Sequence, residues 1–342
     1  MHMRVPESPP MIPRISDTDR PFWSVMIPVY NCIDYLEEAM NSVLRQDPGP
    51  EQMQIEVVDD HSTDGDVETL VSSVGKGRIK YHRQKSNIGS LRNFESCIKR
   101  SKGYHVHLLH GDDRVEPGFY KEIENLFRSF PEAGAAFTNF SFIDINGEDT
   151  EIHNERLRAE PGLITDFLFK IARCQLIQPP SIVVKRSTYE TLGSFYAVHF
   201  GEDWEMWTRI AAHYPMAYSP NVLASYRVAH GIGISQGYFS TGQNITDILK
   251  VIDIVQSYLP VEKRLSIKNA ARAYYAMYSV KIANCFLVFN RKAALQQARG
   301  AWMMSKDLRT TFWIVRFYLM YALHYKTIEE KLRTLRSKKL QV

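Results

Sequence analysis

The sequence predicts an α/β domain built on a mostly parallel β-sheet with flanking helices, followed by a helical C-terminal region. Apolar, strand-like runs alternate with segments of helical periodicity through the first part of the chain. From about Asn244 onward the pattern is helical throughout, with few glycines and prolines. The chain has 342 residues, of which 44% are hydrophobic and 23% charged. This composition is typical of a globular protein with one large or two moderate domains.

Four strand-to-helix units open the predicted sheet. Each strand run is rich in apolar and β-branched residues, and each helical run places apolar residues three or four positions apart. Such alternation is typical of parallel strands joined by crossover helices. The expected strand and helix pairs are 23–31 with 33–46, 54–60 with 66–74, 78–84 with 89–101, and 104–113 with 117–130.

The rest of the chain adds fewer strands and more helices. We expect a strand and turn at 135–147, a strand and helix at 179–193, and a helix at 201–214. Three or four helices should follow. The predicted division of the chain is a flexible, proline-containing lead-in at 1–21, the sheet domain at 22–240, and the helical region at 241–342.

Charge, cysteines and hydropathy exclude several classes of protein. The net charge of +4 is too small to indicate nucleic-acid binding by the whole chain. The 4 cysteines are far apart in the sequence, which predicts neither a disulfide framework nor a zinc site. The apolar stretch 312–325 is interrupted by Arg316 and His324 and is shorter than the ~20 residues of a spanning helix. With no signal-like run at the start, a cytoplasmic location is expected.

Polar residues follow three of the predicted strands. Ligands of open α/β sheets bind at the carboxyl ends of the strands, where the loops gather. Three residue pairs stand at these ends and are expected to lie close together: Tyr30–Asn31, Asp59–Asp60 and Asp112–Asp113.

The carboxylates allow specific chemistry. Asp112 and Asp113 offer the oxygen ligands that Mg²⁺ and Mn²⁺ prefer, although a plain acidic turn is the alternative. Asp60 can accept a hydrogen bond from a nucleobase N–H group. Glu202 and Asp203 begin a predicted helix, where they either complement its dipole or face a cleft and accept a proton. The glycine-rich motifs of dinucleotide-binding proteins and P-loop ATPases are absent from the sequence.

The ordered motifs "VMIPVYN", "VVDDHSTDG", "NIGSLRN", "HGDD" and "GEDWEMW" resemble the family 2 glycosyltransferases. These are inverting enzymes of the GT-A fold, a Rossmann-like sheet flanked by helices, and they use nucleotide-sugar donors. The resemblance covers about residues 22–236 and rests on five motifs in the same order and at similar spacings.

The resemblance implies a nucleotide site at the strand ends. Asp60 would accept from the base, with Tyr30 and the backbone around Pro28 lining the pocket. Asp112 would face the ribose or the sugar. Arg92, in "NIGSLRN", corresponds to a family position near the substrate.

The resemblance also implies a metal and a catalytic base. Asp113 would be the direct ligand of Mn²⁺ or Mg²⁺, and His230 would reach the metal or the diphosphate from a downstream loop. Asp203 would be the general base. Glu202 and Trp204 would line the acceptor and sugar pocket, with core packing as the alternative for Trp204.

The sequence thus indicates a metal-dependent inverting glycosyltransferase. We expect it to move a sugar, from a UDP-sugar by preference, to a hydroxyl of a glycan or lipid-linked acceptor in surface polysaccharide synthesis. The alternatives are a nucleotide-sugar-binding protein without transfer activity and a nucleotidyltransferase. The C-terminal stretch 326–342 carries six basic against two acidic residues. With the apolar stretch before it, this region predicts contact with the inner face of the cytoplasmic membrane, or else packing within a helical bundle or homo-oligomer.

Overall fold

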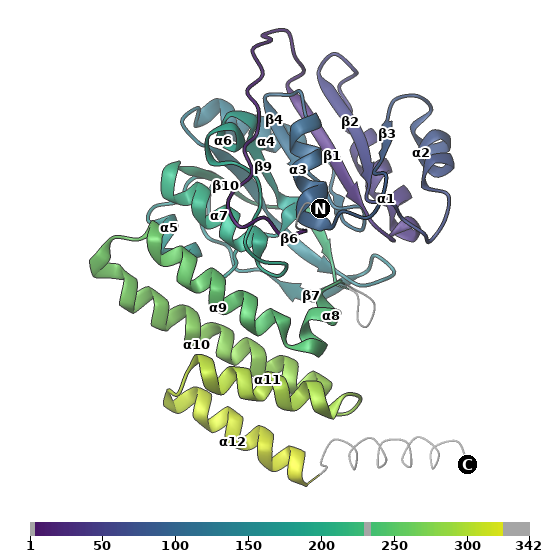
Figure 1. Ribbon diagram of the computed structural model, residues 1–342. Helices are drawn as coiled ribbons and strands as arrows, with labels where there is room; N and C mark the ends of the chain where they lie inside the picture. Colours follow the sequence, from purple (N-terminus) through teal and green to yellow (C-terminus); the bar gives the residue numbers. More distant parts are fainter. Residues whose placement is uncertain (1–3, 229–233, 324–342) are drawn as a thin grey trace. The chain divides into compact units, whose positions relative to one another are not determined.

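The computed structural model describes residues 4–228 and 234–323 (Figure 1). The chain divides into two compact units. The first comprises Met1–Ile171 and Gln175–His230, and the second comprises Ala172–Cys174 and Gly231–Val342. Each unit is described by itself.

The first unit is built on one sheet, to which ten strands of the described residues contribute. The main path of the sheet runs β3-β2-β1-β4-β9-β6-β10-β5, while β7 pairs with β6 and β8 pairs with β10. The strands are β1 (Trp23–Val29), β2 (Met53–Asp59), β3 (Lys80–Arg83), β4 (His105–Leu108), β5 (Arg114–Val115), β6 (Ala135–Ile143), β7 (Asp149–His153), β8 (Gly162–Leu163), β9 (Ile182–Lys185) and β10 (Met216–Arg227).

The first four strand–helix units lie where the sequence predicts them, and β1 to β4 pair in parallel. The second half of the sheet is mixed, because β9 runs antiparallel to both β4 and β6. The helices of this unit are α1 (Ile33–Leu44), α2 (Val67–Gly75), α3 (Ser90–Arg100), α4 (Phe119–Ser129), α5 (Phe167–Ile171), α6 (Arg186–Leu192) and α7 (Glu202–His213), with a 3₁₀ turn at Pro179–Ser181.

Strand β1 is the centre of the core. All of its residues are buried, as expected for a strand covered on both faces. Its alternate residues Trp23, Val25, Ile27 and Val29 share one core cluster with apolar side chains of α1 and α4. Burial of this apolar surface holds β1 and its neighbours in register, so the ends of these strands have fixed positions.

The N-terminal segment, which we expected to be a flexible lead-in, instead follows a defined path along the first unit. The carbonyl of Pro6 accepts from the backbone N–H of Ala197 at 2.9 Å, and that of Pro10 accepts from Ser194 at 2.9 Å. Ile12 is buried. Prolines limit the conformations of the free chain and still offer carbonyl acceptors, so a proline-rich segment loses little entropy when it docks.

The second unit is helical. Its helices are α8 (Ile234–Thr241), α9 (Gln243–Val255), α10 (Val261–Phe286), α11 (Arg291–Met304) and α12 (Leu308–Ala322), and α10 contacts α9, α11 and α12 (Figure 1). Phe286, Ala294 and Phe317 belong to its core. Within 4–228 and 234–323, the helices are too short or too polar to cross a membrane.

Candidate active site

The ends of β1, β2 and β4 meet at one edge of the sheet. The backbone N–H of Asp60, just past β2, donates to Val29 of β1 at 2.8 Å. The N–H of Gly111, past β4, donates to Pro28 of β1 at 3.2 Å. The three predicted strand ends therefore lie side by side, as the parallel register requires.

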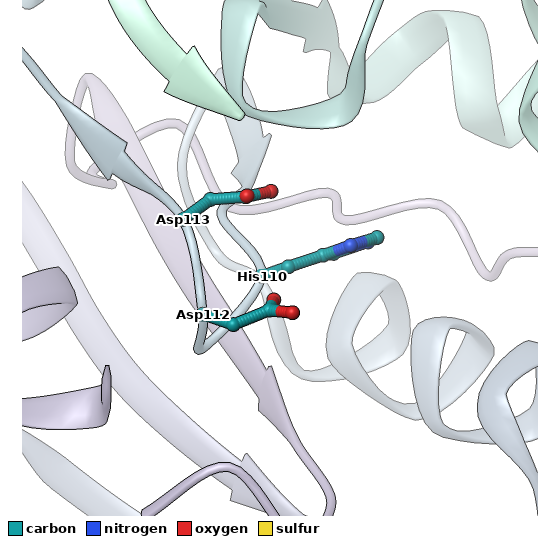
Figure 2. A group of neighbouring side chains, drawn as sticks. All are labelled: His110, Asp112 and Asp113. Atoms are coloured by element: carbon teal, nitrogen blue, oxygen red, sulfur yellow. The ribbon is translucent and has the colours of Figure 1, made fainter. Parts of the chain in front are cut away.

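The turn after β4 gathers three metal-ligating side chains. His110, Asp112 and Asp113 each offer one ligand atom, and these atoms lie within 4.8 Å of one another. Figure 2 shows the three side chains projecting to the same side of the turn. Gly111 lets this turn approach β1, because a Cβ atom there would lie 2.9 Å from the sulfur of Cys32 and 3.0 Å from a Val29 methyl group.

Asp113 has one occupied and one open carboxylate oxygen. Its side chain is buried, and Oδ1 accepts from the backbone N–H of Arg227 at 2.8 Å. Oδ2 is buried with no hydrogen-bond partner among the described residues. Burial raises the pKa of Asp113, and the neighbouring charge of Asp112 adds to the effect. An orphaned buried oxygen beside a second carboxylate fits a cation ligand better than a plain acidic turn.

His110 was not singled out from the sequence, although it stands two positions before Asp112 in the motif "HGDD". Its ring stacks on Phe94 of α3, with centroids 5.1 Å apart and planes at 13°. Burial lowers the pKa of His110, which favours the neutral imidazole that can bind a metal. The structure therefore adds a nitrogen to the predicted oxygen ligands.

Arg227 holds the turn from the end of β10 and was also missed. Its Nε donates to the backbone carbonyl of Asp112 at 2.7 Å, in addition to the backbone bond to Asp113. Its guanidinium pairs with Glu38 of α1 and lies 4.5 Å from the ring centre of Tyr35. Because Arg227 is buried and satisfied on several sides, it fixes the backbone of the acidic turn.

The carboxylate of Asp60 is held by the loop before α3. Its Oδ1 accepts from the backbone N–H of Ile88 at 2.8 Å, and Oδ2 accepts from that of Gly89 at 2.9 Å. Burial raises the pKa of Asp60, while these two bonds lower it. Each oxygen keeps a further lone pair, so the group can still accept from a ligand. Tyr30 is 42% exposed at the neighbouring strand end.

Two other polar residues of this region have protein partners. Asp59 accepts from the Ser62 hydroxyl at 2.6 Å and pairs with Arg83 at 2.8 Å, so it stabilises the loop after β2. Arg92 lies on α3 and pairs with Glu95 at 2.7 Å. The role of Arg92 toward a nucleotide stays a prediction.

Asp203 stands at the beginning of α7. Its Oδ1 accepts from the backbone N–H of Trp204 at 2.7 Å, and Oδ2 accepts from Nε2 of Gln175 at 2.6 Å. Burial raises its pKa to about 6, against the lowering effect of both bonds. A carboxylate with a pKa near neutrality is well placed to take up a proton. Gln175 lies 28 positions earlier in the chain, and nothing in the sequence pattern pointed to it.

Trp204 corrects one of our predictions. We expected it to line a sugar pocket, but its side chain has 0% exposure and its indole N–H donates to the carbonyl of Ile171 at 2.6 Å. Trp207 is buried as well. A buried indole N–H usually finds such a partner, as that of Trp204 does, and α7 is buried over most of its circumference. Glu202, the first residue of α7, is half-buried.

Aromatic side chains connect the acidic turn with α7. Phe94, which stacks on His110, makes an edge contact with Phe195 at 5.4 Å between centroids. Phe195 in turn contacts Trp207 of α7 at 5.7 Å. The turn and the helix that carries Asp203 therefore belong to one packed region. His230, the other predicted metal contact, lies outside the described residues.

Comparison with known proteins shows similarity to glycosyltransferases. Residues 24–191 match the model of glycosyl transferase family 2. An uncharacterized glycosyltransferase of Rickettsia conorii is 30% identical over 213 residues, which cover 61% of this chain and 33% of that protein.

Solved structures share the fold. The crystal structure of S. aureus TarS 1-349 in complex with UDP-GlcNAc has a TM-score of 0.64 at 15% identity, covering 91% of each chain. The mannosyltransferase PcManGT from Pyrobaculum calidifontis, in complex with GDP-Man and Mn²⁺, has a TM-score of 0.56 at 16% identity, covering 98% of this chain and 90% of that one. The predicted GT-A fold is thereby confirmed. The segment 24–191 of this chain belongs to glycosyl transferase family 2.

Proposed function

We propose that this protein is an inverting, metal-dependent glycosyltransferase with a nucleoside diphosphate sugar as donor, a UDP-sugar by preference. The observation that carries the proposal is the orphaned Oδ2 of Asp113 within the cluster of His110, Asp112 and Asp113. The family match and the nucleotide-sugar complexes of TarS and PcManGT support it. The nucleotidyltransferase alternative has no comparable support.

The residues of the turn fit a divalent cation. Two carboxylates and a neutral imidazole within 4.8 Å of one another form a set that suits Mn²⁺ better than Mg²⁺, because Mg²⁺ prefers oxygen ligands. When bound, such a cation neutralises the negative charge that develops on the departing diphosphate. Arg227 fixes the turn on which the ligands stand.

The other residues bind the donor and move the proton. Asp60 accepts from a base N–H, with Tyr30 and Pro28 beside it, and Asp112 faces the ribose or sugar. The carboxylate of Asp203 takes the proton of the acceptor hydroxyl as that oxygen attacks the anomeric carbon. One displacement inverts the configuration of that carbon. Gln175 keeps the Asp203 carboxylate in place.

Calorimetric titration tests the proposal. UDP, dTDP, GDP and CMP are titrated into the protein with Mn²⁺ and with EDTA. We expect one diphosphate to bind tightly and only with Mn²⁺, which identifies the donor's nucleotide without knowledge of the acceptor. Absence of metal-dependent binding by all of them would contradict the proposal and favour a different ligand for this site.

The pH profile tests the role of Gln175. Transfer should fall as the pH drops below about 6, because Asp203 is then protonated. Gln175→Ala removes a hydrogen bond that favours the charged carboxylate, so the acid limb should move to higher pH, while KM for the donor stays the same. Gln178→Ala, in the same loop, is the matched control. An unchanged acid limb in Gln175→Ala would show that this bond does not govern the base.

We further propose that α12 rests on an anionic membrane surface, at the cytoplasmic face where a lipid-linked glycan acceptor would be presented. Leu308, Phe312, Val315 and Leu319 follow one another at spacings of three or four and are 91%, 64%, 53% and 59% exposed. The helix also carries Arg309 and Arg316 and has no acidic residue. Exposed apolar groups beside cations match the chemistry of an anionic lipid surface.

Vesicle flotation tests this face. The protein should float with phosphatidylcholine vesicles that contain phosphatidylglycerol, and the double variant Phe312→Ser with Leu319→Ser should float several-fold less. The matched control is Val261→Ser with Leu265→Ser, at exposed apolar residues of α10. Equal flotation of both variants and the parent would contradict the membrane proposal. If the parent protein self-associates and only the α12 variant abolishes this, the exposed apolar residues of α12 bind a second copy of the chain instead of a membrane.

A further inference from the structure

The N-terminal segment packs into a defined binding surface on the rest of the first unit. We define residues 4–20 as the strap. A Cβ atom at Gly193 would lie 2.8 Å from the carbonyl oxygen of Pro10 and 2.9 Å from the Cβ of Pro9, so glycine at this position makes room for the strap. The buried guanidinium of Arg186 donates to the carbonyl of Pro13 at 3.1 Å. These contacts, with those of Pro6 and Pro10 to the loop before α7, hold the strap along its length.

At its beginning the strap places a cation beside the predicted nucleobase site. The guanidinium of Arg4 donates to the backbone carbonyl of Asn87 at 3.2 Å. Its stem lies on Gly89, where an added Cβ would be 3.3 Å from the Arg4 Cβ. Gly89 is one of the two residues whose N–H groups hold Asp60, and the charge of Arg4 offsets a small part of the rise that burial causes in the pKa of that carboxyl. Arg4 is exposed, so most of its donors face solvent.

The guanidinium of Arg4 and the carboxylate of Asp60 together place a hydrogen-bond donor next to an acceptor. A carboxylate accepts from a ring N–H, and a guanidinium N–H donates to a carbonyl oxygen beside it. Uracil, thymine and guanine present a ring N–H next to a carbonyl. Cytosine presents an unprotonated ring nitrogen next to an amino group, which is the opposite pattern. Arg4 and Asp60 should therefore favour uracil, thymine and guanine over cytosine.

We propose that Arg4 is a donor-binding residue, supplied by the strap, which reads the nucleobase edge together with Asp60. This inference rests on the proposed function, since it assumes that Asp60 faces the base. It gives the N-terminal segment a role in choosing the nucleotide, which neither the family match over 24–191 nor the sequence motifs assign.

The test compares Arg4→Ala with the parent protein by calorimetry, using UDP, GDP and dTDP against CDP, each with Mn²⁺. Arg4 is exposed, so the variant should fold, and an unchanged unfolding temperature verifies this. Affinity for the preferred diphosphate should fall about tenfold, the effect of losing one hydrogen bond from a charged group, while affinity for CDP changes little. Arg14→Ala, an exposed arginine on the same strap, is the matched control and should bind as the parent does.

The outcomes separate the two proposals. If the parent binds a diphosphate with Mn²⁺ and Arg4→Ala binds it equally well, the role of Arg4 is wrong while the proposed function stands. If Arg4→Ala loses affinity for CDP by the same factor, the guanidinium contacts the phosphates and the base-reading role is wrong. If the parent binds none of the diphosphates, both proposals fail.

Discussion

Asp203→Asn should lower the rate of sugar transfer by about 10²–10⁴-fold, the usual contribution of a general base, while the affinity for the nucleoside diphosphate with Mn²⁺ stays unchanged. The amide has the same shape as the carboxylate and can still accept from the Trp204 N–H, but it cannot take up a proton at neutral pH. The measurement is transfer rate in parallel with calorimetric donor binding.

Stability provides the control for Asp203→Asn. Burial raises the folded-state pKa of Asp203 from 3.8 to about 6, so the folded protein binds this proton more tightly than the unfolded chain does. The group therefore stabilises the fold less as the pH rises through this range, and its charge opposes folding at pH 8. The amide lacks that charge, so its unfolding temperature at pH 8 should equal or exceed that of the parent. A variant that still transfers sugar at the parent's rate would contradict the assignment of Asp203 as base.

Asp113→Asn should weaken Mn²⁺ binding by at least ~10²-fold, since even residues that only orient metal ligands commonly contribute 10–100-fold. The substitution should remove a metal ligand without disturbing the backbone of the turn. An asparagine oxygen can keep the bond from the Arg227 N–H, which then directs the amide NH₂, a donor, to the place of the orphaned Oδ2. The fold of the turn is preserved, and its best cation ligand is lost.

Electron paramagnetic resonance of free Mn²⁺ measures this affinity without substrate or turnover. Asp253→Asn is the matched control, because Asp253 is an exposed carboxylate of the helical unit that pairs with Lys268. An Asp113→Asn protein that binds Mn²⁺ as tightly as the parent would show that the turn is not the metal site.

Features that depend on local pattern could be predicted from the sequence. Apolar runs in the sequence predict the strands β1, β2 and β4. The polar residues that follow these strands lie close together because parallel strands in register end at the same edge of the sheet. For that reason Asp60 and the pair Asp112–Asp113 were found as neighbours of one site.

Features that depend on contacts between distant residues could not be predicted. Arg227 reaches Asp113 across 114 positions, and Gln175 reaches Asp203 across 28. Neither contact has a local signature. Arg227 donates to Asp113 through its backbone N–H and Gln175 donates to Asp203 through its side-chain amide, and the geometry of both hydrogen bonds exists only in the folded chain.

Two errors have particular physical causes. The resemblance to glycosyltransferases placed Trp204 at a sugar pocket, with core packing as the alternative, yet α7 is buried from Trp204 through Ile210 and the indole lies in the core. The strap was expected to be flexible because residues 1–20 contain four prolines and no apolar run. Its carbonyls nevertheless find donors on Ser194 and Ala197, which no pattern along the chain reveals.

The most direct test of the account is anomalous diffraction from a crystal of the protein grown with Mn²⁺ and UDP. We expect one strong manganese peak in contact with Asp113 Oδ2, with Asp112 or His110 as a second ligand, together with density for the bound UDP. A bound nucleotide with no manganese at this turn, or manganese bound elsewhere in the first unit, would contradict the central claim that the turn from His110 to Asp113 holds the cation of the donor.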